Sequence, residues 1–299
     1  MKKVSFIFVA LMGMMAASCG NQSDELSNEQ TVEQSQLVPV RVHVEGFSLS
    51  HEEFSGVQTR AAQDVTDYTG VTSITLAFYA TNGTEAYKST QAKGDADYGT
   101  FSLSLPMGSY TMVAVAYYNS DASPLVLTSP TEAAFTGTRP YETFATTQAV
   151  NITNTSAVDI SATLNRIITQ LKVVSSDGKT ADVSNVRMTF SAGGKDFNPT
   201  TGFAITNTGF ANTVGNSASV GTSSTSLGFL FLATDEQNID VTIETLDAGG
   251  NTLFSKTVTN VPFQRNRVTK LTGAMYTNEA LSGTFLVETA WLDEYNANF

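Results

Sequence analysis

Apolar and polar residues alternate one by one through much of this chain. Residues 38–44 (VPVRVHV) place valine at every second position, and a period of two buries one face of a β-sheet. The same pattern returns at 71–80, 100–105, 110–118, 157–164, 166–174, 186–191, 228–233, 239–246, 253–261, 267–276 and 284–290. No stretch sustains the 3.6-residue apolar period of a helix, so the pattern predicts an all-β protein.

Turn signals separate the predicted strands. Asn82-Gly83, residues 106–109 (PMGS) and residues 247–251 (DAGGN) contain glycine, which supplies backbone angles that other residues avoid. Short strands at a spacing of roughly 8–12 residues favour β-sandwiches over a parallel sheet with crossover helices.

About 260 residues follow the first 36, which is enough for two ordinary domains. We therefore expect two tandem β-sandwich domains, at residues 37–160 and 161–299. Two segments rich in small and polar residues, 120–147 and 207–226, are expected to be surface loops.

The N-terminal pattern is different and predicts export. Lys2 and Lys3 precede an apolar run of about a dozen residues, which is too short to span a bilayer core that needs roughly 20. Small residues then lead to Cys19, the single cysteine of the chain. Residues 1–18 are therefore predicted to be a signal peptide, and Cys19 resembles the acylated lipobox cysteine of bacterial lipoproteins. An ordinary signal-peptide cleavage site is the alternative.

Residues 19–36 are expected to be a flexible acidic tether, because they are almost free of large apolar side chains and cannot bury enough surface to fold. A lipidated Cys19 would anchor the chain to the outer membrane at the cell surface without spanning it. The acidic residues 23–25 resemble a surface-export signal of some lipoproteins, although a solvated linker explains them equally well.

The charge and cysteine content exclude other classes. With 28 acidic and 16 basic residues, the net charge is −12, and nucleic-acid binding needs a basic surface instead. Because no cysteine follows Cys19, disulfides cannot staple the fold and its stability must come from packed apolar side chains.

The sequence offers little catalytic chemistry. His43 and His51 have no ligand partners at zinc spacing, and no G-x-S-x-G motif is present. Four carboxylates near turns are more typical of solvated loops than of a calcium or glycosidase site: Asp64, Asp67, Asp95 and Asp97. We therefore expect no catalytic residue, no metal and no cofactor, and a structural or binding role.

Four segments resemble the fimbrillins, the lipoprotein-derived pilins and anchor or minor subunits of type V fimbriae. These segments are 57–62 (VQTRAA), 164–172 (LNRIITQLK), 261–273 (VPFQRNRVTKLTG) and 285–291 (FLVETAW). The resemblance implies Greek-key, transthyretin-like sandwiches and a structural subunit of cell-surface fimbriae that supports adhesion. Its implied partners are other fimbrial subunits and the outer membrane, with a host protein or glycan as a further candidate.

The resemblance also implies a mechanism. An arginine-specific protease would cut between Arg60 and Ala61 and release the first strand, 38–49. A neighbouring subunit would then fill the gap with its C-terminal tail, 284–299, by strand addition. The candidate donor side chains are Phe285, Val287, Thr289 and Trp291. Alternatively, Arg60 is only an exposed arginine and the tail, with Trp291, belongs to its own domain.

A second functional class stays open. A surface lipoprotein with this fold could bind glycans or host proteins without polymerising. Tyr117, Tyr118 and Tyr141 are the candidate aromatic platform, although alternation along 110–118 should bury about half of that strand's side chains.

Overall fold

The computed structural model describes residues 36–48, 63–277 and 286–291. These residues form strands and turns with no helix, so the all-β prediction is confirmed. Accordingly, the described part of the chain contains no helix that could cross a membrane. The leader, Cys19, the bond between Arg60 and Ala61, and Phe285 lie outside the described residues.

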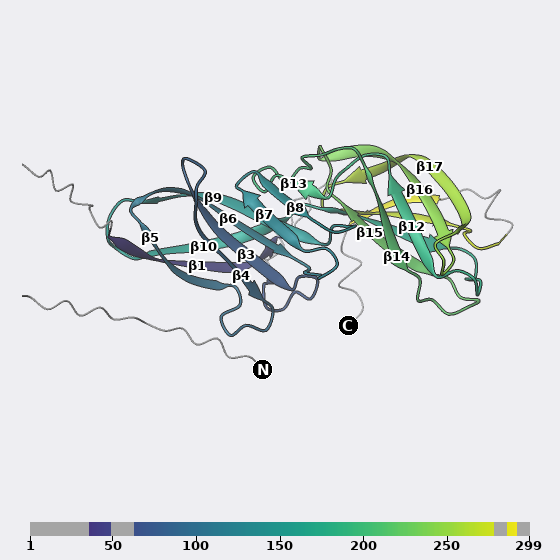
Figure 1. Cartoon of the computed structure of the whole chain (residues 1–299), viewed down its shortest axis with the longest axis horizontal. Helices are drawn as coiled ribbons and strands as arrows, with labels where there is room; N and C mark the ends of the chain where they lie inside the picture. Colours follow the sequence, from purple (N-terminus) through teal and green to yellow (C-terminus); the bar gives the residue numbers. More distant parts are fainter. Residues whose placement is uncertain (1–35, 49–62, 278–285, 292–299) are drawn as a thin grey trace, which may run out of the picture. The chain divides into compact units, whose positions relative to one another are not determined.

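Residues 37–166 form one hydrogen-bonded path of strands that folds back on itself (Figure 1). Its order is β2 (Gln63–Asp64), β1 (Leu37–Ser48), β10 (Val158–Arg166), β9 (Thr143–Ile152), β6 (Gly108–Tyr117), β3 (Ser73–Ala80) and β4 (Glu85–Ala92), and β5 (Thr100–Pro106) also pairs with β1. Only two residue pairs, at Asn165 and Arg166, join β10 to β9. The path therefore bends there into two layers, whose alternate side chains meet in a shared apolar core.

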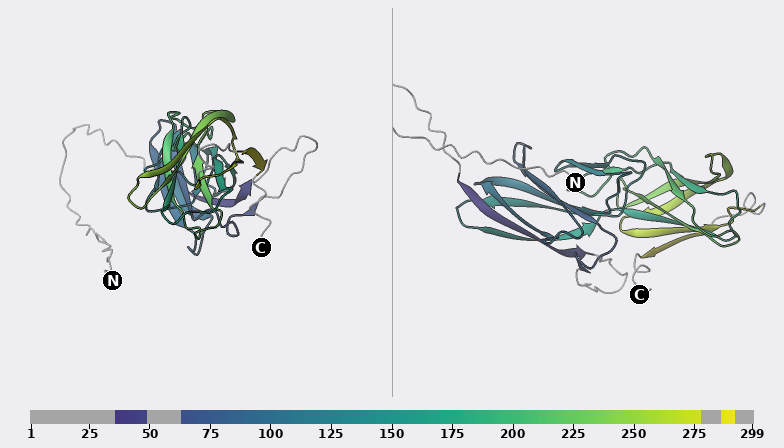
Figure 2. Two further views of the ribbon diagram at one scale, coloured as in Figure 1. Left: turned by 90° about the vertical axis from the view of Figure 1, so that its right-hand side faces the viewer. Right: turned by 60° about the horizontal axis from the view of Figure 1, so that its bottom comes forward.

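Residues 169–291 contribute two further four-stranded sheets. The first has the order β15 (Thr225–Leu230), β11 (Thr169–Ser175), β18 (Arg267–Gly273) and β19 (Leu286–Trp291). The second has the order β14 (Phe210–Gly215), β12 (Asn185–Phe190), β16 (Glu236–Leu246) and β17 (Thr252–Gln264). Their inward side chains form a second core. The right-hand view of Figure 2 shows the strands of this half of the chain. The domain boundary at residues 160 and 161 stays a prediction.

A third sheet joins the two parts of the chain. It consists of β7 (Leu125–Ser129), β8 (Glu132–Phe135) and β13 (Asp196–Phe197). Its side chains pack with Ala77, Tyr79 and Val113 on the side of β3 and β6 that faces away from the first core. Consequently β3 and β6 are buried on both faces, whereas alternation predicted a solvent face for each.

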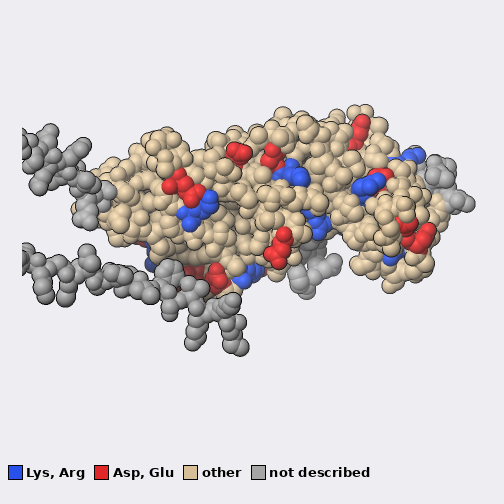
Figure 3. All heavy atoms as spheres, viewed as in Figure 1, with Lys and Arg blue, Asp and Glu red and all other residues tan. Residues whose placement is uncertain are grey.

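The two segments expected to be loops contain regular structure. β7, β8 and the start of β9 lie within 120–147, and β14 and the start of β15 lie within 207–226. The loop prediction is therefore wrong for these strands. Because these segments are rich in small and polar residues, they show no clear alternation of apolar and polar positions. Their backbones nevertheless pair with neighbouring strands in the sheets. On the face shown in Figure 3, acidic and basic side chains are interspersed and form no single charged patch.

Candidate functional site

The first strand is enclosed by backbone hydrogen bonding on both sides. β1 runs parallel to β10 and antiparallel to β5, and its far end also pairs with β2. β1 is therefore an inner strand of its layer, although it belongs to the N-terminal segment that the family resemblance marks as removable.

The side chains of β1 alternate between core and solvent. Val38, Val40, Val42 and Val44 are 0–2% exposed, while the residues between them are exposed. A bulge between Val44 and Gly46 shifts the register by one residue, and Phe47 then returns to the core with 0% exposure. The strand thus buries a row of four valine side chains followed by one phenylalanine ring.

The aromatic end of β1 packs against a charged cluster. The Phe47 ring lies 4.5 Å from the Phe144 ring and 5.3 Å from the Tyr68 ring, measured between centroids. The Arg166 guanidinium lies 4.8 Å from the Phe144 ring centroid, which is within the range of a cation–π contact. The end of the first strand is therefore one wall of the site around Arg166.

Arg166 is the centre of a buried polar network. Its Nη2 lies 2.8 Å from Glu142 Oε1 and donates to Tyr68 Oη at 2.7 Å, while Nη1 donates to Asn266 Oδ1 at 3.1 Å. Tyr68 Oη in turn donates to Glu142 Oε1 at 2.5 Å. Burial, and then the charge of Glu142, raise the pKa of Tyr68 well above its ordinary value, so Tyr68 stays a neutral donor.

The network brings together two of the fimbrillin-like segments. Arg166 belongs to 164–172, and Asn266 belongs to 261–273. Asn266 has a positive φ of 60°, which asparagine tolerates better than most residues, and its N–H donates to Ile168 O at 3.0 Å. Thr169 Oγ1 donates to Arg267 O at 2.9 Å, so the connection from β10 to β11 is held against the turn before β18.

The C-terminal tail contributes the edge strand β19. It pairs antiparallel with β18, with Val287 opposite Leu271, Thr289 opposite Thr269 and Trp291 opposite Arg267. In this chain the described part of the tail, β19, therefore lies on the sheet that contains β18. Donation of the tail to another subunit stays a prediction.

Asp177 fixes the backbone shortly before the tail. Its carboxylate accepts hydrogen bonds from the N–H groups of Met275, Tyr276 and Thr277, each at 2.8–2.9 Å. Burial alone would raise the pKa of Asp177, but these hydrogen bonds outweigh it and hold the pKa below its ordinary value. The position at which the tail leaves the second core is set by this carboxylate.

Asp177→Asn is expected to lower the free energy of unfolding by about 1–2 kcal/mol at neutral pH, because the amide replaces an acceptor oxygen with a donor. Since the folded pKa is depressed, the stabilisation is present above the unfolded pKa of about 3.9 and is lost as pH falls through the folded value. Denaturant unfolding should show that the free energy of unfolding of the variant and that of the wild type differ less at pH 3 than at pH 7. The exposed Asp182→Asn is the control, and a difference that is equal at both pH values would contradict the role of the charge.

The other sequence candidates do not form a catalytic or metal site within the described residues. No group of three His, Cys, Asp or Glu side chains is placed to hold a metal ion in the described ranges. Asp64 Oδ1 accepts from Thr66 N at 2.8 Å, a local turn contact, and His43 Nδ1 lies 3.1 Å from Thr100 Oγ1 on the exposed face of β1. His51 is outside the described residues.

The three tyrosines proposed as an aromatic platform differ in exposure. Tyr117 is only 5% exposed and lies in the third apolar cluster, so it cannot contribute to a surface. Tyr118 is 43% exposed, and its ring lies 5.3 Å from that of Tyr141. The platform is therefore reduced to two residues.

Comparison with known proteins identifies the family. The family described as "Family of unknown function (DUF6562)" matches residues 40–298, which is most of the chain, and the protein belongs to that family. No curated protein matches the sequence.

Solved structures share the fold at low sequence identity. Two candidate adhesins from Bacteroides ovatus align with TM-scores of 0.51 and 0.52 and identities of 10% and 12%. The alignments cover 87% and 85% of this chain and 96% and 93% of those chains. The fimbrial anchor protein Mfa2 from Porphyromonas gingivalis aligns over 85% of this chain and 97% of its own, with 10% identity and a TM-score of 0.47. The two adhesin alignments agree with the predicted resemblance at the level of the fold.

Proposed function

We propose that this protein is a structural subunit of cell-surface fimbriae and that neighbouring subunits associate by strand exchange. The observation that carries the proposal is the way β1 is held in the fold. Its backbone pairs with β5 and β10, and five of its side chains are nearly or fully buried. Loss of β1 opens a long slot with unpaired backbone groups on both walls, which a strand from another chain can fill.

The position of Arg60 supports this proposal. Residues 49–62 connect β1 to β2, so a cut between Arg60 and Ala61 separates the first strand from the rest of the chain. Tyr68 lies downstream of this bond and stays in the same chain as its hydrogen-bond partners Arg166 and Glu142. Cleavage would therefore empty the slot but leave in the chain the residues that form this polar network when a strand fills the slot.

The tail is the proposed donor, and the N-terminus is the proposed anchor. Residues 284–299 follow the point that Asp177 fixes and include the alternating candidates Phe285, Val287, Thr289 and Trp291. A lipid on Cys19 would hold the precursor at the outer membrane until cleavage releases it. A subunit that is never cut would remain anchored.

Treatment with an arginine-specific protease tests the proposal. The purified protein should lose residues up to 60 and then form a ladder of multimers on a non-denaturing gel. Arg60→Lys keeps the positive charge but removes the cleavage site, so this variant should stay intact and monomeric. Protein that is cut after Arg60 and remains a monomer would contradict strand exchange.

A further inference from the structure

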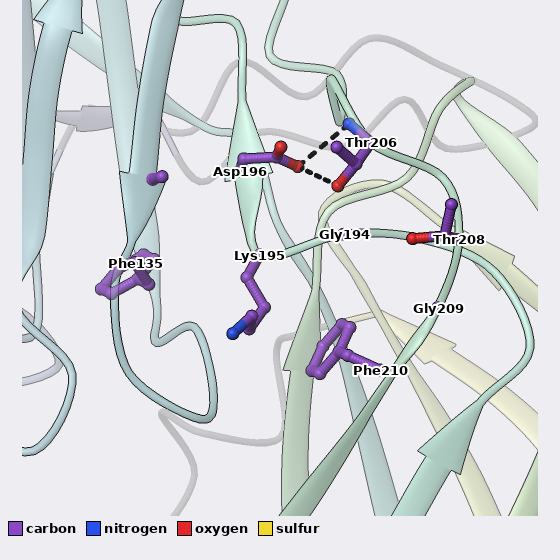
Figure 4. A pocket seen from close by; sticks show the side chains of 9 residues that line it. Phe135, Gly194, Lys195, Asp196, Thr206, Thr208, Gly209 and Phe210 are labelled. Atoms are coloured by element: carbon purple, nitrogen blue, oxygen red, sulfur yellow. Dashed lines mark hydrogen bonds between the residues drawn. The ribbon is translucent and has the colours of Figure 1, made fainter.

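A pocket of about 270 Å³ opens beside β13, and the proposed strand exchange does not use it. Its walls come from the end of β8, from residues 194–196 and from residues 206–210 (Figure 4). β8 belongs to the first half of the chain and the other two segments to the second half. The pocket therefore lies where the two halves meet, which is a frequent place for small-molecule sites.

Close backbone approaches fix the shape of this pocket. A Cβ atom at Gly194 would lie 2.4 Å from Thr206 O, and one at Gly209 would lie 2.1 Å from Phe190 O. Gly209 also has a φ of +73°, which is unfavourable for other residues. Asn207 Oδ1 accepts from Gly193 N at 2.6 Å and ties the two segments together. The pocket is therefore preformed.

Polar groups with unused hydrogen-bonding capacity line the pocket. Lys195 Nζ donates to Gly137 O at 2.6 Å, which occupies one of its three N–H donors. Asp196 Oδ1 accepts from Thr206 N at 3.0 Å and from Thr206 Oγ1 at 2.7 Å, and no described residue donates to Oδ2. The Thr208 hydroxyl points toward the Gly194 segment in Figure 4.

Two aromatic rings complete the lining. Phe210 is half-buried, and Figure 4 shows its ring beside the Lys195 side chain, whose amine points away from the ring. Phe135 lies across the pocket and is itself buried. The pocket thus combines a donor, an acceptor, a hydroxyl and an apolar surface within a small volume.

We propose that this pocket binds one neutral sugar unit. An anion would meet the Asp196 carboxylate, and a cation would meet the Lys195 ammonium. An apolar ligand would desolvate both charges without offering either one a hydrogen bond. A neutral sugar donates to Asp196, accepts from Lys195 and places its C–H face on Phe210. The volume of about 270 Å³ lies just below the usual range of ligand pockets, roughly 300–1,000 Å³, and fits a single ring.

Saturation-transfer NMR on the full chain tests this inference. The probes are methyl glycosides of glucose, galactose, mannose, fucose, N-acetylglucosamine and N-acetylgalactosamine, with glucuronic acid and N-acetylneuraminic acid as acidic comparisons. At least one neutral glycoside should bind. Lys195→Met keeps the side-chain length and removes the donor, so the affinity should fall roughly tenfold, as expected for one charge-assisted hydrogen bond. Thr208→Val should also weaken binding.

Matched variants separate the pocket from other surfaces. Lys256→Met replaces a half-buried lysine on β17 outside the pocket and should bind like wild type. The inference is overturned if no neutral glycoside binds, if acidic sugars bind better, or if Lys195→Met binds as wild type does. Loss of binding in Tyr118→Ala with retention in Lys195→Met would place the sugar on the tyrosine surface instead. None of these results depends on strand exchange, which the protease experiment tests separately.

Discussion

A chain that begins at Gln63 is expected to lose the folded core of residues 63–166 and to associate in solution. β1 supplies five side chains of 2% exposure or less to that core. At roughly 1.5–3 kcal/mol for each buried side chain, their loss is on the order of 10 kcal/mol, which is comparable to the whole stability of a typical protein, about 5–15 kcal/mol. Size-exclusion chromatography and near-UV circular dichroism should show the change.

A synthetic peptide of residues 36–49 should restore a compact monomer when it is added to this truncated chain. The control is the same peptide with Val40→Asp and Val42→Asp, which would bury two carboxylates and should have no effect. A peptide of residues 284–299 should compete for the slot. If the truncated chain is a stable monomer without any peptide, β1 is dispensable and the slot is not a binding site. If the peptide of residues 36–49 restores the monomer and the peptide of residues 284–299 does not compete, the slot is a strand-binding site but the tail is not its donor.

Arg166→Met should lower the free energy of unfolding by about 3–5 kcal/mol, because it leaves the partly buried Glu142 without its guanidinium partner. The side chain of Arg166 is 6% exposed and that of Glu142 is 17% exposed. The melting temperature should fall by roughly 10 °C for a chain of this size. Thermal and denaturant unfolding measure both effects.

An exposed ion pair provides the control for Arg166. Lys88 and Glu85 are 36% and 42% exposed, and Glu85→Gln should change stability by no more than about 0.5 kcal/mol. The double variant Arg166→Met with Glu142→Gln should lose less than the sum of its single variants, since each change removes the same interaction. A cost below about 1 kcal/mol for Arg166→Met would mean that the network does not hold the two segments together.

Local patterns were sufficient to predict the strands that have one solvent face. Valine at every second position of 38–44 predicts β1, and the structure buries each of those valines. The same reasoning fails for β3, where Thr75 is 5% exposed beside fully buried apolar neighbours. Alternation assumes water on one side, and only the tertiary structure shows that β7, β8 and β13 cover that side.

The site around Arg166 could be predicted only in part. The segments that contain Arg166 and Asn266 were singled out by family resemblance, but their contact joins residues 100 positions apart. Tyr68 and Glu142 carry no local signal, because each belongs to the site only through a partner far along the chain. A single sequence contains no information about such pairs beyond residue type.

The opposite directions of β5 and β10 have a consequence for filament polarity. Whichever way an incoming strand enters between them, it runs parallel to one wall and antiparallel to the other. Main-chain bonding therefore distinguishes the two orientations only weakly. Side-chain volume would therefore determine the orientation of the incoming strand, because a bulky ring fits the Phe47 end of the slot and branched aliphatic side chains fit the rest of it. The position of the large residue within the donor segment would then determine the direction in which the subunits follow one another along a fibre.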